Sequence, residues 1–184
     1  LSMETPVLHA NINKNSVFLV TGGARGVTAE CVCRMAKQFK CTFILLGRSV
    51  LQTTEPEWAQ EITDAGDLKR KAMEFLLAEG QKPLPKTIQR MTGAVVAQRE
   101  IQANIDFIRN QGAAVVYEAV DVTDAAAIKS VLDRVTVKTG AITGIIHGAG
   151  VLADKRIENK TEADFDAVFD VKIQGLLAIT QAVD

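Results

Sequence analysis

The feature that constrains the fold most is a short apolar run that passes through a glycine turn into a helical pattern. Residues 17–21 have the length and composition of a buried strand, and Gly22 and Gly23 follow immediately. Apolar residues then recur at helical spacing, on a stripe formed by Val27, Cys31, Met35 and Phe39. A strand that turns directly into a helix begins a βαβ unit, so the sequence predicts a parallel sheet.

The alternation of strands and helices continues along the chain. Three further strands are predicted at residues 42–46, 113–120 and 142–146. The last helix is predicted to begin near Thr161, where a Thr-Glu-Ala-Asp sequence resembles a capping box. The intervening helices carry apolar stripes of Ile101, Ile105 and Ile108, and of Ile128, Val131, Leu132 and Val135. The pattern predicts an α/β fold, a Rossmann-type doubly wound parallel sheet that ends after its fourth strand and the following helix.

One domain is predicted for residues 16–184, with residues 1–15 as a linker. Residues 50–97 exceed what a crossover between parallel strands needs, and we predict an inserted helical segment there. A helix in this segment carries Leu68, Ala72, Phe75 and Leu76, and a turn with two prolines follows it at residues 82–86. The segment is expected to pack beside the sheet, and an organised lid is the alternative.

Composition narrows the function to classes that need no strong surface charge. The chain has 21 basic and 22 acidic residues, a balance that provides no field for nucleic acid or a membrane surface. It shows neither an apolar run of membrane-spanning length nor a secretory signal, so we expect a cytoplasmic protein. Cys31, Cys33 and Cys41 are expected to be reduced thiols, because no second ligand pair accompanies them to bind a metal.

The first candidate site is the glycine turn, which comprises Thr21, Gly22, Gly23, Ala24, Arg25, Gly26 and Val27. Glycines allow the backbone to turn tightly and to approach a pyrophosphate, which would lie on the N-terminus of the following helix. Thr28 stands where the dinucleotide fingerprint has its last glycine. The alternative is a tight strand-to-helix connection without a ligand.

The second candidate site follows the strand predicted at residues 42–46 and comprises Gly47, Arg48 and Ser49. At this position of a dinucleotide-binding sheet an acidic residue accepts hydrogen bonds from the ribose 2′-hydroxyl, whereas an arginine suits a 2′-phosphate. Arg48 therefore predicts NADPH in preference to NADH, with Arg25 and Ser49 as additional contacts. The alternative is a solvated arginine at the end of a strand.

Two further segments follow the third and fourth predicted strands. Asp121 is placed to accept a hydrogen bond from adenine while Val122 packs on the ring, and Thr123 or Asp124 would cap the next helix. The other segment would let the backbone pass close to a ribose and nicotinamide, and it comprises His147, Gly148, Ala149 and Gly150. His147 is also considered as a catalytic base, although its ring has no evident partner in the sequence.

Lys172 lies on an apolar stripe of the last predicted helix, together with Phe165, Val168, Phe169 and Leu176. A lysine that faces the core is unfavourable unless a partner or a site accepts its ammonium group. We therefore predict a functional lysine on the buried face of this helix. The alternative is a side chain whose apolar stem is buried while its ammonium group reaches the surface.

Together these motifs resemble the short-chain dehydrogenase/reductase superfamily, and in particular the ketoreductase domains of type I polyketide synthases and polyunsaturated fatty acid synthases. The resemblance rests on three sequences, Val-Thr-Gly-Gly-Ala-Arg-Gly-Val-Thr at 20–28, Leu-Gly-Arg-Ser at 46–49 and His-Gly-Ala-Gly at 147–150. The long stretch that contains Trp58 and leads to Arg99, Glu100 and Ile101 is also similar. The resemblance extends over residues 16–184.

The resemblance implies hydride transfer from NADPH to a β-ketoacyl group on an acyl carrier protein, within a synthase that has other domains. It further implies that the glycine turn binds the pyrophosphate, Arg48 the 2′-phosphate, and Asp121 and Val122 the adenine. Lys172 corresponds to the lysine that supports proton transfer by the family's catalytic serine and tyrosine.

The sequence ends at Asp184, ahead of the strand and helix on which the family carries that serine and tyrosine. Tyr117 lies on the third predicted strand, which is the wrong place for the proton donor. We therefore expect negligible reductase activity from these 184 residues alone, and a fourth strand that forms an edge of the sheet. Two alternatives are a noncatalytic nucleotide-binding module and an extended reductase of nucleotide sugars.

Overall fold

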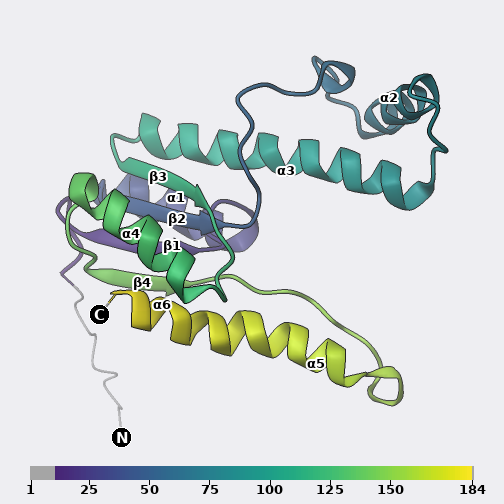
Figure 1. The fold of residues 1–184 in the computed structure, drawn as a ribbon. Coiled ribbons are helices and arrows are strands. Elements are labelled where there is room, and N and C mark those ends of the chain that lie inside the picture. Colours follow the sequence, from purple (N-terminus) through teal and green to yellow (C-terminus); the bar gives the residue numbers. More distant parts are fainter. Residues whose placement is uncertain (1–10, 184) are drawn as a thin grey trace, which may run out of the picture.

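The computed structural model describes residues 11–183, which form one parallel sheet of four strands (Figure 1). The strands lie in the order β3-β2-β1-β4, so that β4 is at an edge. They are β1 (Val17–Thr21), β2 (Thr42–Gly47), β3 (Ala114–Ala119) and β4 (Gly144–His147). The chain crosses to the other side of β1 after β3, which is the strand order of a doubly wound fold. The predicted fold class is confirmed, and residues 1–10 of the predicted linker lie outside the described residues.

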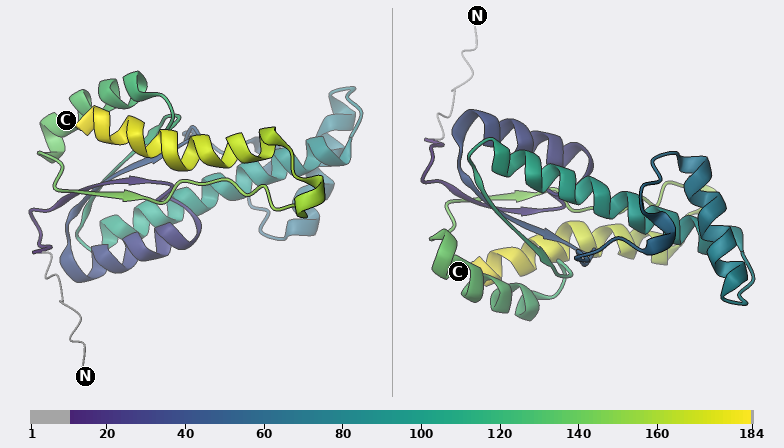
Figure 2. Two further views of the ribbon diagram at one scale, coloured as in Figure 1. Left: turned by 90° about the horizontal axis from the view of Figure 1, so that it is seen from below. Right: turned by 90° about the horizontal axis from the view of Figure 1, so that it is seen from above.

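Helices cover both faces of the sheet (Figure 2). α1 (Gly26–Phe39) and α3 (Pro85–Asn110) pack on one face, and α4 (Ala125–Thr139) and α6 (Gly175–Val183) pack on the other. Because successive strand residues point to opposite faces, Val20 contributes to the first core and Leu19 to the second. No helix among residues 11–183 is both long enough and apolar enough to cross a membrane.

The buried face of α1 differs from the predicted stripe. Val27 is 84% exposed and Cys31 is exposed. The buried residues of this helix are Ala29, Val32, Cys33 and Ala36. Small side chains at helical spacing let α1 approach the sheet closely, a signal that is hidden when only the larger apolar residues are counted. Burial raises the pKa of the Cys33 thiol, so this cysteine is protonated at neutral pH.

The insertion between β2 and β3 consists of η1 (Glu57–Ala59), α2 (Ala65–Ala78) and the N-terminal half of α3. α3 is one continuous helix of 26 residues, with a proline at its start, so residue 97 is not an element boundary. The insertion and the crossover helix are therefore one structure. α2 packs on α3 and η1, and it lies beyond the end of the sheet (Figure 1).

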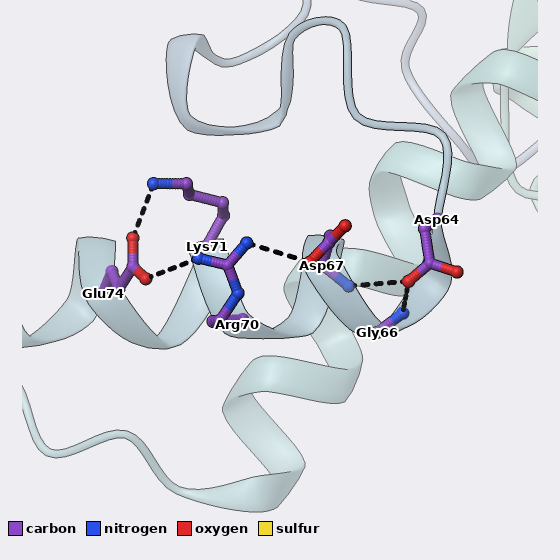
Figure 3. Close-up of polar contacts among 6 residues, drawn as sticks. All are labelled: Asp64, Gly66, Asp67, Arg70, Lys71 and Glu74. Carbon is purple, nitrogen blue, oxygen red and sulfur yellow. Dashed lines mark hydrogen bonds and ion pairs between the residues drawn. The ribbon is translucent and has the colours of Figure 1, made fainter.

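Local polar contacts stabilise α2 at the surface (Figure 3). Asp64 caps the helix and accepts hydrogen bonds from the amides of Gly66 and Asp67 at 2.8 and 2.9 Å. Arg70 forms ion pairs with Asp67 and Glu74, and Glu74 also pairs with Lys71. These pairs are exposed, so they contribute little to tertiary packing. The buried attachment of α2 comes from Leu68, Ala72 and Leu76.

Arg99 of α3 holds the loop that precedes α2. Its guanidinium forms a bidentate ion pair with Glu55 at 2.6 and 2.9 Å, and donates to the carbonyl oxygens of Ala59 and Ile62 at 2.8 and 2.5 Å. We expect Arg99→Ala to lower the free energy of unfolding by about 2 kcal/mol, because these acceptors lose a partly buried cation. Urea denaturation measures the change, and limited proteolysis should show faster cleavage within residues 50–62.

Arg109→Ala is the matched control for this substitution. Arg109 is on the same helix, and its only ion pair among residues 11–183 is an exposed one with Asp106 at 3.7 Å. Its loss should change stability by less than about 0.5 kcal/mol. Equal effects of the two substitutions would contradict an anchoring role for Arg99.

The C-terminal segment runs through a short helix, η2 (Ile157–Asn159), then α5 (Glu162–Phe169), a π-turn (Asp170–Gln174) and α6. Thr161 caps α5 in a reciprocal capping box with Asp164, which confirms the predicted helix start. The Lys155 ammonium and the Thr161 donors stabilise the Asp164 carboxylate and hold its pKa well below the usual range.

The prediction that Lys172 lies on a buried face is wrong. Lys172 is exposed, Phe165 is 59% exposed, and α5 buries no residue. The π-turn places one extra residue in a helical turn, so the four-residue spacing of α5 does not continue into α6. The residues that α6 buries are Gly175, Ala178, Ile179 and Ala182.

Candidate functional site

A cavity of about 770 Å³ opens at the carboxyl ends of the strands, where the strand order changes direction between β1 and β4. The predicted site residues that line it are Gly22, Ala24, Arg25, Gly26, Val27, Gly47, Arg48, Ser49, Asp121, Val122, Gly148, Ala149 and Gly150. The four candidate segments, which are far apart in the sequence, therefore meet in one place. Its size is within the range of small-molecule sites.

Four predicted residues do not line this cavity, and several others line it without having been predicted. Thr21, Gly23, His147 and Lys172 lie outside its lining. The additional lining residues are Thr28, Leu46, Ile101, Tyr117, Thr123, Leu152, Ala167, Asp170 and Val171. Several of these residues directly follow or precede a predicted motif in the sequence, so the residues at the strand ends predicted the location of the cavity. Asp170 and Val171 directly precede the predicted Lys172, whereas the sequence gave Ile101 only as part of an apolar helix stripe and of the stretch similar to ketoreductases.

The glycine turn is shaped by close backbone contacts. Gly22 has φ of +66°, and a Cβ at this position would lie 2.9 Å from the amide nitrogen of Ala149. Thr28 packs against Gly148, where a Cβ would collide with the threonine side chain. Thr28 therefore stands on α1 where the fingerprint has a glycine, and the missing side chain of Gly148 leaves the space that the threonine side chain occupies.

The N-terminus of α1 is occupied by a carboxylate from α3. Oε1 of Glu100 accepts a hydrogen bond from the Gly26 amide at 2.8 Å, and Oε2 pairs with Nε of Arg25 at 3.1 Å. The Gly26 amide and the Arg25 guanidinium lower the pKa of Glu100, so the side chain is ionised at neutral pH. Asn104, one turn further along α3, donates to the carbonyl oxygen of Ala24 at 2.9 Å. Two residues of α3 therefore hold the glycine turn.

Tyr117 positions the segment that carries Arg48. Its hydroxyl donates to the carbonyl oxygen of Ser49 at 2.6 Å, and a Cβ at Gly47 would lie 2.7 Å from the same hydroxyl. Burial raises the pKa of Tyr117, which keeps the hydroxyl a donor. Arg48 itself is exposed at the mouth of the cavity. The sequence placed Tyr117 on β3 correctly, but its contact with Ser49 spans 68 residues and could not be seen there.

Asp121 and Asp124, which follow β3, form different hydrogen bonds. Asp124 caps α4 and accepts a hydrogen bond from the Ala127 amide at 2.9 Å. Oδ1 of Asp121 accepts from both the amide and the hydroxyl of Thr123, at 2.9 and 2.8 Å. These bonds lower the pKa of Asp121, so an ionised carboxylate lies at the cavity wall with Oδ2 available as an acceptor.

His147 has two hydrogen-bond partners that the sequence did not reveal. Nε2 is 3.0 Å from the carbonyl oxygen of Val171, and Nδ1 is 2.7 Å from Oγ1 of Thr21. A carbonyl oxygen can only accept, so Nε2 carries a proton, and in the neutral ring Nδ1 accepts from the threonine hydroxyl. The hydroxyl oxygen of Thr21 in turn accepts from the amide of Ala149 at 3.3 Å. With both nitrogens engaged, the ring joins β1, β4 and the π-turn.

Lys172 follows Val171 in the π-turn and lies against Gly150. A Cβ at Gly150 would be 3.0 Å from Cε of Lys172 and 3.3 Å from its Nζ. The small residue at position 150 thus leaves room for the lysine beside the cavity wall. No ion pair involving Lys172 is present among residues 11–183, so its ammonium group remains available to a ligand.

Comparison with known proteins gives one consistent family. The sequence model of the KR domain matches residues 16–184. A polyunsaturated fatty acid synthase of Thraustochytrium sp. (strain ATCC 26185 / S-3) is 34% identical over 191 residues, which cover 100% of this chain. The matched region is 7% of that synthase polypeptide, so the chain spans a small part of its relative.

Solved structures share the fold. An N-terminal ketoreductase from the macrolactin assembly line superimposes with a TM-score of 0.64 at 22% identity, over 94% of this chain and 26% of that one. Two short-chain dehydrogenase complexes are each 18% identical. The enzyme from Mycobacterium paratuberculosis bound to NAD has a TM-score of 0.61 and coverage of 93% and 50%. The enzyme from Burkholderia cenocepacia J2315 in complex with NADP has a TM-score of 0.58 and coverage of 94% and 51%.

Proposed function

Since this chain belongs to the KR domain family, the ketoreductase domains of polyketide and polyunsaturated fatty acid synthases, we propose that it forms the NADPH-binding part of such a ketoreductase. The observation that carries the proposal is Arg48 at the end of β2, on the wall of the cavity. The turn at residues 47–49 contains no carboxylate that would accept a ribose 2′-hydroxyl.

The proposed dinucleotide would lie across the four segments that line the cavity. Gly22 lets the glycine turn lie against the backbone of Ala149. The glycine turn and the N-terminus of α1 border the cavity where a pyrophosphate would lie. At one end Arg48 would contact the 2′-phosphate, while Asp121 and Val122 would hold the adenine. At the other end Ala149 and Gly150 would border the nicotinamide. Solved neighbours are complexes with NAD and with NADP, so the choice between them rests on Arg48.

The proposed substrate is a β-ketoacyl group carried by an acyl carrier protein, in a synthase with further domains. NADPH, when bound, supplies a hydride to the ketone carbon. Lys172 is proposed to support the proton that neutralises the resulting alkoxide, because its ammonium group lies beside Gly150, which would border the nicotinamide. The π-turn that carries Lys172 is held by His147 through the carbonyl oxygen of Val171.

Cofactor titration tests the proposal. Following nicotinamide fluorescence, we expect NADPH to bind more tightly than NADH, and Arg48→Ala to reduce NADPH affinity by about 10- to 100-fold while NADH affinity changes little. Such a loss matches one charge-assisted contact to a phosphate. Arg109→Ala removes the same charge from the C-terminal end of α3 and should leave both affinities unchanged.

Two outcomes would contradict the proposal. If neither nucleotide binds, the glycine turn is a structural connection only. If NADPH binds with the same preference after Arg48→Ala, another residue recognises the 2′-phosphate or the preference has another cause.

A further inference from the structure

The N-terminus of α1 carries an unusual charge arrangement. The first turn of α1 contains no acidic residue of its own, and its N-cap residue, Arg25, makes no side-chain capping bond. The cap comes instead from Glu100, 74 residues away, whose carboxylate accepts the Gly26 amide. Ile101, the next residue of α3, is 2% exposed and lines the cavity, so the backbone beside Glu100 is fixed at the cavity edge.

This carboxylate accepts a hydrogen bond at the helix terminus on which the proposed site would bind a phosphate. The positive end of a helix macrodipole and its free amides attract anions, and Glu100 is an anion that already occupies one of those amides. Its pKa is lowered by the Gly26 amide and by Arg25, so it is charged at neutral pH. A pyrophosphate on the glycine turn would therefore face a like charge or displace it.

Glu100 also neutralises a cation that lines the cavity. Arg25 is 46% exposed in its side chain and contributes to the cavity wall, yet its Nε is paired with Oε2 of Glu100. An arginine in a salt bridge offers less charge to a ligand than a free one. One carboxylate thus both occupies the helix terminus and reduces the positive charge of the wall.

We propose that Glu100 is an intramolecular competitor for the cofactor phosphates, which weakens dinucleotide binding and holds Arg25 until the nucleotide arrives. This inference rests on the proposed NADPH site. A bound phosphate would take over the Gly26 amide, and the release of Glu100 would free Arg25 to contact it. The competition weakens both nucleotides, because both carry the pyrophosphate, and it weakens NADPH more because Arg25, which Glu100 holds, is also a predicted contact of the 2′-phosphate.

Glu100→Gln tests the competition. Glutamine has the same shape and can still accept the Gly26 amide, so the cap is retained while the charge is removed. We expect NADPH affinity to rise about tenfold and NADH affinity to rise about threefold. The reason is that the substitution removes one negative charge that repels the phosphates from a half-exposed site. The gain should shrink in about 0.5 M salt, where the Debye length is only a few Å, because it is electrostatic.

Two further variants separate competition from a structural cap. Glu30→Gln makes the same charge change on the exposed side of α1, where Glu30 pairs with Arg34, and it should leave both affinities unchanged. Arg25→Ala should weaken NADPH binding in both backgrounds, but less in the wild-type chain, where the guanidinium must first give up its pair with Glu100 before it contacts a phosphate. In the Glu100→Gln background it should remove most of the tenfold gain.

The outcomes distinguish this inference from the proposal on which it rests. If wild type binds NADPH and Glu100→Gln binds it equally or more weakly, Glu100 is a structural cap and the inference fails alone. If Arg25→Ala weakens NADPH equally in both backgrounds, Glu100 does not restrain Arg25 and the inference fails as well. If wild type binds neither nucleotide, the proposed function fails and the competition fails with it.

Discussion

Gly22→Ala is expected to abolish detectable nucleotide binding and to lower the free energy of unfolding by about 3 kcal/mol. Gly22 has φ of +66°, a conformation that is unfavourable for alanine. The new Cβ would also lie 2.9 Å from the Ala149 nitrogen and 3.0 Å from the Gly148 carbonyl carbon. That backbone cannot retreat freely, because the Gly148 amide donates to the Thr21 carbonyl oxygen at 3.0 Å.

Two other glycines separate backbone strain from collision. Gly112 has φ of +79° but no atom within 4 Å of where a Cβ would lie, so Gly112→Ala should cost about 1 kcal/mol through strain alone. Gly93 lies within α3 with open space around it, and Gly93→Ala should raise stability by about 0.5–1 kcal/mol. Urea denaturation gives the three values, and NADPH titration gives the binding. If Gly22→Ala resembles Gly112→Ala in both measurements, the contact with Ala149 is unimportant.

The sequence predicted what depends on local spacing and on strand ends. Alternating apolar runs and helical stripes gave the parallel sheet, and the turns after β1, β2, β3 and β4 all reached one cavity. Parallel strands place their carboxyl ends at the same edge, so these residues converge without any knowledge of side-chain contacts. The capping box at Thr161 was predicted for the same reason, because its partners are three residues apart.

The contacts that the sequence missed join residues far apart in the chain. Glu100 reaches Gly26, Tyr117 reaches Ser49, and His147 reaches Thr21 across 126 residues. No periodic pattern encodes such pairs. Lys172 was misplaced for another reason, because helical spacing was extended through a turn that the structure forms as a π-turn. Functional turns often depart from regular geometry, and period-based prediction fails where they do.

Thr21→Val is expected to lower the free energy of unfolding by about 2–3 kcal/mol and to weaken NADPH binding by about tenfold or more. Thr21 is fully buried, and valine has nearly its shape without the hydroxyl. The substitution leaves Nδ1 of His147 and the amide of Ala149 without the oxygen that both contact. His147 would then hold the Val171 carbonyl oxygen less firmly, so the π-turn with Lys172 and the wall at Ala149 would shift together.

Two substitutions determine whether the hydroxyl of Thr21 has this role. Thr21→Ser keeps the oxygen and should restore most of the binding and stability. Thr136→Val removes a hydroxyl that only donates to the carbonyl oxygen of Leu132 within α4, and it should change stability by less than about 1 kcal/mol. Urea denaturation and NADPH titration are again the measurements. If Thr21→Val and Thr136→Val are equally mild, the path from β1 through His147 to the π-turn does not hold the site. If Thr21→Val alone is severe and serine rescues it, the hydroxyl positions both the cavity wall and Lys172.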